Sequence, residues 1–88
     1  MTETRPASAV HTLARAVPSI ALRVVAVDPG DAAELAREGL LPGSLVTVAT
    51  RTPLGGPLVV NLGPARLALA RALAGRIVVE PADTEPGA

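Results

Sequence analysis

Few side chains in this 88-residue sequence could carry out chemistry, and their spacing matches no catalytic motif. His11 is the only histidine, and no second metal ligand stands at a useful distance from it along the chain. Ser19, Ser44 and the threonines have no nearby histidine or lysine that could activate them as nucleophiles. The absence of cysteine removes disulfides and thiolate metal sites. We therefore predict no catalytic residue, no metal site, no cofactor and no enzymatic activity.

One short segment gathers four acidic residues, namely Asp28, Asp31, Glu34 and Glu38. Carboxylate oxygens at such a turn could bind a hard cation. The spacing of Asp31 and Glu34 is also that of a capping box, in which both side chains serve the first turn of a helix. Arg37 and Glu38 then fall on the solvated face of that helix. We favour the helix cap over the metal site.

The pair Gly55-Gly56 has a superficial likeness to a phosphate-binding loop. It lacks the lysine, the Ser/Thr and the helix that would follow in such a loop. Prolines and glycines surround it in the segment TPLGGP, so we predict a hairpin loop.

All eight basic residues are arginines, and eight acids balance them. Four of these arginines could lie together if neighbouring strands pair: Arg51, Arg66, Arg71 and Arg76. Such a patch could meet acidic groups on a partner, or it could only keep an apolar surface soluble, and both interpretations stay open. Nucleic acid is not expected, because the net charge is zero and no aromatic residue could stack on bases.

Short runs of β-branched and alternating apolar residues, separated by Gly/Pro turns, predict the elements that position these side chains. We expect strands at 19–27, 45–51, 57–62, 66–69 and 77–80, a two-turn helix from 31 that ends at Gly39, and a helical turn at 70–74. Strands this short and closely spaced favour a mainly β fold, a small closed or nearly closed barrel.

The rest of the chain sets the limits of this domain. We expect residues 1–12 and 81–88 to be disordered and residues 13–80 to form one domain. No apolar run approaches the roughly 18 residues of a membrane span, so we expect no membrane insertion. The N-terminus lacks the features of a secretory signal, which predicts a cytoplasmic protein. A core without aromatic residues makes self-association an open possibility.

The order of these pieces resembles the ferrous-iron transport protein A (FeoA) family over roughly residues 13–80. The resemblance is carried by Gly39-Leu40 with Pro42-Gly43, by the segment from Arg51 to Pro57, and by Arg66-Leu67-Ala68-Leu69-Ala70-Arg71. Each piece alone is weak, and their order and spacing together are fairly specific.

The resemblance implies an SH3-like β-barrel of about five strands, with one short helix after the first strand and a helical turn before the last. It also implies a non-enzymatic cytosolic accessory protein of ferrous-iron uptake that docks on the cytoplasmic part of an FeoB-type transporter. The candidate contact residues are Arg51, Leu54, Gly55, Gly56, Pro57, Arg66 and Arg71. Two alternatives remain: an SH3-like regulatory module related to the C-terminal domain of iron-dependent repressors, and a direct transition-metal-binding protein.

The sequence departs from the family after Arg71. Family members commonly have acidic and polar residues there, whereas this chain has Ala72-Leu73-Ala74-Gly75. Either this segment is an interface, or the turn is buried more deeply than usual.

Overall fold

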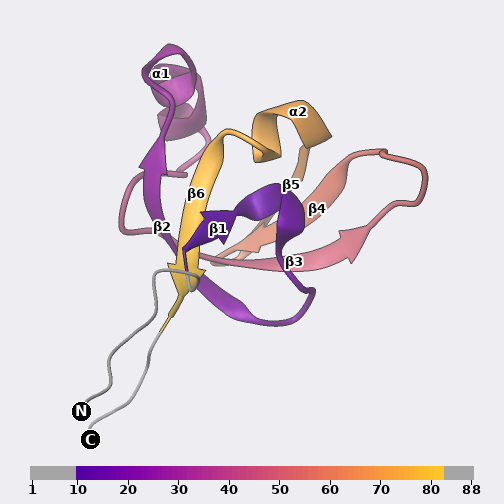
Figure 1. The fold of residues 1–88 in the computed structure, drawn as a ribbon. Helices are drawn as coiled ribbons and strands as arrows, with labels where there is room; N and C mark the ends of the chain where they lie inside the picture. The colour runs from indigo at the N-terminus through magenta and orange to yellow at the C-terminus, as the bar shows by residue number, and fades with distance from the viewer. Residues whose placement is uncertain (1–9, 83–88) are drawn as a thin grey trace, which may run out of the picture.

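The computed structural model describes residues 10–82, which form one antiparallel sheet with short helices at its ends (Figure 1). The strands are β1 (His11–Thr12), β2 (Ala21–Val27), β3 (Leu45–Arg51), β4 (Leu58–Leu62), β5 (Ala65–Leu69) and β6 (Ile77–Pro81). A 3-10 helix, η2 (Leu13–Arg15), follows β1, and the α-helices are α1 (Pro29–Arg37) and α2 (Arg71–Ala74). Neither helix within the described part is long and apolar enough to cross a membrane.

The strands follow the order β1-β6-β2-β3-β4-β5, so the sheet is strongly curved but open, with β1 and β5 at its two edges. The mainly β prediction is confirmed, including the short helix after the first long strand and the helical turn before the last. The expected closed or nearly closed barrel is present as a sheet that does not close fully, since β1 and β5 do not pair. A sixth strand appears because His11 and Thr12 pair with Val79 and Val78 of β6.

That pairing corrects the expected disordered N-terminal segment, since residues 11 and 12 belong to the sheet. At the other end, Pro81 is still part of β6, and the backbone N–H of Ala82 donates to the carbonyl of Ala21 at 2.9 Å. Residues 1–9 and 83–88 of the two expected segments lie outside the described residues. Short local patterns could not predict the β1–β6 pair, because two residues carry no detectable alternation.

Alternation along the strands builds the core. Two alternate residues in each of β2, β3, β4 and β6 are buried on the concave side of the sheet, where apolar side chains from the helices and turns complete the packing. The buried residues are all aliphatic: Leu13, Ala16, Leu22, Val24, Leu35, Leu40, Val46, Val48, Leu58, Val60, Leu69, Ala74, Ile77 and Val79. The apolar segment after Arg71 was expected to be either an interface or a deeply buried turn. Ala74 is buried, because α2 packs part of that segment into the core.

The start of α1 differs from the prediction. Asp28, not Asp31, is the N-cap, and its carboxylate accepts a hydrogen bond from the N–H of Gly30 at 3.0 Å. Pro29 occupies the first helical position, where its fixed φ and missing N–H are tolerated. The N-cap therefore lies three residues before the expected Asp31. The predicted end is confirmed, since Gly39 adopts a φ of 92°.

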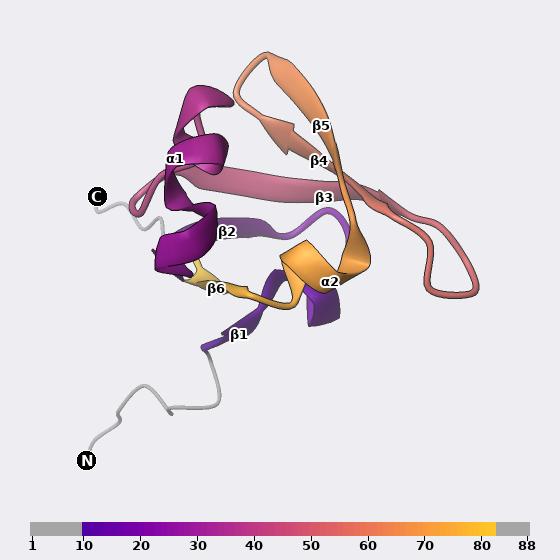
Figure 2. The same ribbon diagram turned by 90° about the horizontal axis from the view of Figure 1, so that it is seen from above.

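Figure 2 shows how far apart two parts of this fold lie. The loop between β3 and β4 projects from one side of the sheet, and α1 lies at the opposite side. The antiparallel pairing of Arg51 with Leu58 at the end of β3 and β4 fixes the base of this loop.

Candidate functional site

The loop at residues 52–57 presents one apolar side chain to solvent. Leu54 is 102% exposed, whereas the buried leucines of the core are 4% exposed or less. Its φ of 62° lies in the left-handed region, which is unfavourable for a residue with a Cβ. Gly55 follows with a φ of 76°, which suits glycine. The backbone therefore turns sharply at the tip and holds Leu54 away from the fold.

Hydrogen bonds brace the base of the same loop. The hydroxyl of Thr52 donates to the carbonyl of Pro57 at 2.8 Å, and the N–H of Thr52 reaches the same carbonyl at 3.4 Å. The N–H of Gly56 donates to the carbonyl of Pro53 at 3.3 Å. A Cβ on Gly56 would collide with the hydroxyl oxygen of Thr52, so only glycine fits while that hydroxyl keeps its bond. The predicted hairpin loop is thus present, with Gly56 required by packing.

Two of the predicted arginines lie at this end of the molecule, and both turn inward. Nη1 of Arg51 donates to the carbonyl of Ala16 at 2.7 Å, which ties the end of β3 to the segment after η2. Nη2 of Arg71 lies 3.4 Å from the carbonyl of Thr52, at the base of the loop. The Nε of Arg71 is buried and has no hydrogen-bond partner within residues 10–82. Arg71 thus lies beside the loop, and one of its donors stays buried and unpaired among the described residues.

The other two arginines lie elsewhere. Arg66 on β5 is exposed, and its Nε donates to Oδ1 of Asn61, the residue paired with it on β4, at 3.2 Å. Arg76 forms an ion pair with Asp31, with 2.8 Å between Nε and Oδ2. The structure therefore brings Arg51 and Arg71 to the loop and separates Arg66 and Arg76 from it.

The ion pair of Arg76 with Asp31 joins the turn before β6 to α1 across 45 positions of sequence. Its hydrogen bond lowers the pKa of Asp31 and raises the pKa of Arg76, because each charged form stabilises the other. Asp28 and Asp31 are therefore used in a helix cap and an ion pair. Within residues 10–82, no group of three or more His, Cys, Asp or Glu side chains is placed to hold a metal ion. The described arrangement offers recognition by shape and charge.

A second feature escaped the sequence analysis, a groove of about 390 Å³ between α1 and β5 that reaches α2. Its lining combines acidic residues of α1, alternating residues of β5 and one leucine of α2: Asp31, Glu34, Leu35, Glu38, Arg66, Leu67, Ala68, Leu69 and Leu73. The capping-box interpretation assigned Asp31 and Glu34 to the helix start and Glu38 to a solvated face, and did not predict a neighbouring surface. The usable signal was the apolar segment after Arg71, which contains Leu73 of α2.

Comparisons with known proteins identify the domain. A family model described as the FeoA domain matches residues 11–81. A crystal structure of an iron uptake regulatory protein (FeoA) is 31% identical, with a TM-score of 0.72 over 81% of this chain and 94% of that one. None of the curated proteins matches the chain.

Two further solved structures are similar to this chain. FeoA of Stenotrophomonas maltophilia complexed with zinc, described as a prokaryotic SH3 domain protein and a candidate ferrous-iron transport activating factor, is 31% identical. Its TM-score is 0.66 over 78% of this chain and 88% of that one. A manganese-dependent transcriptional repressor is 21% identical with a TM-score of 0.74, over 83% of this chain and 42% of the repressor. At that identity the repressor shows a shared fold alone.

Proposed function

This chain belongs to the FeoA family, and from that membership we propose that it is a non-enzymatic accessory protein that docks on the cytoplasmic part of an FeoB-type ferrous-iron transporter. Its similarity to an iron uptake regulatory protein and to a candidate transport activating factor supports a role in ferrous-iron uptake. The described residues support recognition of another protein, because they offer an exposed apolar tip and basic groups.

The observation that carries this proposal is the exposed Leu54. This side chain is fully exposed and adds no packing to the fold, yet the backbone holds Leu54 in a left-handed conformation at the tip of a braced loop. Full burial of a leucine against a partner contributes about 1.5–3 kcal/mol. Because the loop is already braced, little conformational entropy is lost when it docks. These properties are those of an interface anchor.

The guanidinium of Arg71 supplies the polar part of this contact. It lies beside the loop, where its Nη2 is 3.4 Å from the carbonyl oxygen of Thr52. A carboxylate on the transporter could accept hydrogen bonds from the terminal Nη groups of Arg71, since its Nε is buried. Arg51 contributes indirectly, because its guanidinium is bonded to Ala16 and fixes the base of the loop. Arg66 lies outside this contact.

The experiment is an amide NMR titration of this chain with the cytoplasmic region of an FeoB-type transporter, with and without guanine nucleotide. We expect shifts concentrated at residues 51–58 and at Arg71. Leu54→Asp places a charge where the apolar contact forms and should abolish binding without unfolding the domain, since the side chain touches nothing else. Leu41→Asp is the matched control, because Leu41 is 49% exposed and lies in the turn before β3.

Two results would reject this contact. One is unchanged affinity of a folded Leu54→Asp variant, which excludes the loop. The other is equal loss of binding in both variants, which shows that any added negative charge interferes. A spectrum that does not move in either nucleotide state would reject docking on the cytoplasmic region itself.

The shared fold with the metal-dependent repressor favours one second candidate, a regulatory module that acts beside a transcription factor. Association of the chain with chromatin in cells would reveal it. Direct metal binding is the remaining alternative, since the Stenotrophomonas relative is complexed with zinc. Anaerobic calorimetry with ferrous iron and with zinc tests it, and absence of binding heat would remove it.

A further inference from the structure

A free strand edge borders the groove beside α1. The two-residue turn at Gly63-Pro64 makes Leu62 and Ala65 the closing pair of the β4–β5 hairpin. Hydrogen bonding then alternates along β5, so the backbone N–H and C=O groups of Arg66 and Ala68 point away from β4. Within residues 10–82, no other strand pairs with that side of β5.

This edge differs from the opposite edge of the sheet. The edge strand β1 has two residues, which is too short to template a further strand, whereas β5 has five. A longer edge with unpaired backbone groups accepts an extended peptide as an additional strand. Both residues with outward backbone groups, Arg66 and Ala68, line the groove. The groove therefore lies where such a peptide would run.

Leucines form the apolar part of the groove. Leu35 of α1 and Leu69 of β5 belong to the buried core, and Leu67 and Leu73 pack against it while remaining partly exposed. With a volume of about 390 Å³, the groove can accept an apolar side chain from a peptide lying along β5.

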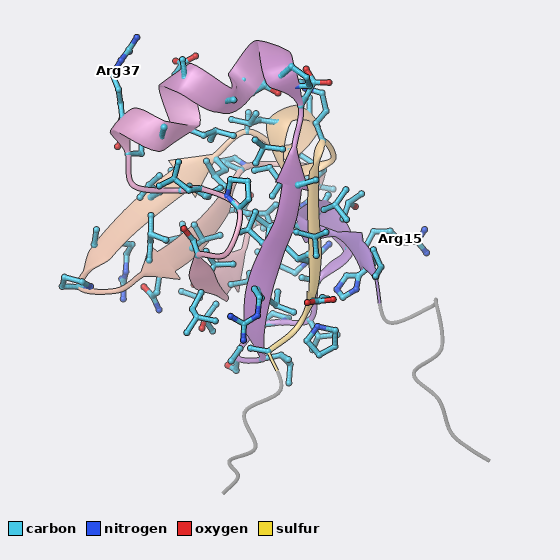
Figure 3. All side chains as sticks on the ribbon, turned by 90° about the vertical axis from the view of Figure 1, so that its left-hand side faces the viewer. Arg15 and Arg37 are labelled. Atoms are coloured by element: carbon cyan, nitrogen blue, oxygen red, sulfur yellow. The ribbon has the colours of Figure 1, made fainter. Side chains whose placement is uncertain are left out.

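The wall formed by α1 is acidic and uncompensated. Asp31 is already paired with Arg76. Glu34 of α1 and Glu38, the C-cap of this helix, lie about one turn apart, and neither forms an ion pair within the described part of the chain. Arg37, the basic residue between them, points away from the body of the molecule at the end of α1 (Figure 3). The lining thus sets two unpaired carboxylates against the single guanidinium of Arg66.

We propose that this groove binds an extended segment of a partner protein in which basic and apolar residues alternate, and that the segment adds to β5 as a seventh strand. Backbone hydrogen bonds to Arg66 and Ala68 supply the pairing. An apolar side chain enters the space over Leu67 and Leu73, and basic side chains meet Glu34 and Glu38. This surface lies away from the hairpin loop, so the proposal does not depend on docking through Leu54.

The test uses the whole chain and a blocked pentapeptide in which arginine alternates with valine. Amide NMR should show shifts at Arg66 and Ala68, together with slower hydrogen exchange at these two amides. A blocked pentapeptide in which glutamate alternates with valine should bind at least tenfold more weakly. A higher salt concentration should weaken binding of the arginine peptide, because its contacts to the exposed carboxylates are screened.

A backbone substitution separates strand addition from simple charge attraction. Ala68→Pro removes the outward N–H and leaves the β4 side of the strand paired, since proline is tolerated at an edge position. We expect Ala68→Pro to bind the arginine peptide about tenfold more weakly, because one backbone hydrogen bond to the peptide is lost. Ala68→Val keeps the N–H and should bind as the parent does. Spectra of both variants establish that the fold persists.

Three outcomes would overturn the proposal. Equal binding by Ala68→Pro and Ala68→Val would exclude strand addition. Equal binding of the two peptides would exclude the acidic wall as the selector. Concentration-dependent self-association in the absence of peptide, abolished by Ala68→Pro, would assign the edge to a second copy of this chain.

Discussion

The hairpin loop and the groove beside α1 use the same residue types in opposite ways. At the loop, a leucine is fully exposed while Arg51 and Arg71 turn inward to backbone carbonyls. At the groove, the leucines are recessed and charged residues form the rim. One surface offers an apolar projection to a partner, and the other offers an apolar recess with an acidic wall.

This difference shows that the residue type alone does not decide whether a side chain stabilises the fold or contacts a partner. Leu54 and Leu69 are both leucines, and Arg51 and Arg66 are both arginines near one end of a strand. Their surroundings decide which residue stabilises the fold and which remains available to a partner.

The largest expected effect separates the two leucines. Leu69→Ala removes a side chain that is 4% exposed and should lower the free energy of unfolding by about 2–5 kcal/mol, because it leaves a cavity under the groove. Leu54→Ala should change that free energy by no more than about 0.5 kcal/mol, since the side chain is in solvent. Urea unfolding followed by far-UV circular dichroism measures both. Equal losses would show that Leu54 packs against the fold after all.

A smaller difference is expected between two arginines that the sequence presented as equivalent. Arg51→Met leaves the carbonyl of Ala16 without its 2.7 Å donor and should cost about 1–3 kcal/mol. Arg66→Met removes an exposed bond to Asn61 and should cost no more than about 0.5 kcal/mol. Thermal unfolding of the two variants makes the comparison. A larger loss for Arg66→Met would reverse the roles given to these side chains.

The smallest effect is on the pH dependence at the α1 side. Because Arg76 lowers the pKa of Asp31 in the folded state, the pair stabilises the fold above the ordinary aspartate pKa of 3.8. That contribution is lost as pH falls below this value and the carboxylate becomes protonated. Asp31→Asn removes the contribution at every pH, so thermal stability of the variant and the parent should converge in acid and differ near neutrality.

A matched control keeps this effect specific to the α1 side. Glu38→Gln changes the carboxylate at the C-cap of the same helix, which is outside any ion pair of the described residues. Its stability profile should follow that of the parent. Parallel acid losses in the parent and in Asp31→Asn would mean that other carboxylates control this range.

Much of the fold could be predicted because its signals are local. The strand at 45–51 has the predicted bounds, and the strands at 57–62, 66–69 and 77–80 differ from the structure by one residue at one end. Gly39 and the TPLGGP segment mark the helix end and the loop as expected. Side-chain alternation and the φ preferences of Gly and Pro act over a few residues and can be read directly.

The candidate site was less predictable because it depends on contacts between distant segments. Seven contact residues were predicted from the sequence. Nothing in it indicated that the guanidinium of Arg51 bonds to the carbonyl of Ala16, or that Arg66 lines the groove beside α1. It placed Asp31 at a helix cap, whereas the folded chain pairs this residue with Arg76. Whether the loop contacts a transporter stays a prediction.

The sequence by itself determined the number and spacing of the main strands, the position of the hairpin loop and the family resemblance, because these follow from period, turn residues and motif order. Tertiary structure alone decided that β1 joins β6, that the sheet stays open, and that α1 and β5 enclose a groove. The physical reason is that strand register and helix placement are set by burying a shared aliphatic core. Which polar groups become neighbours, and which strand edge stays free, then follows from that packing.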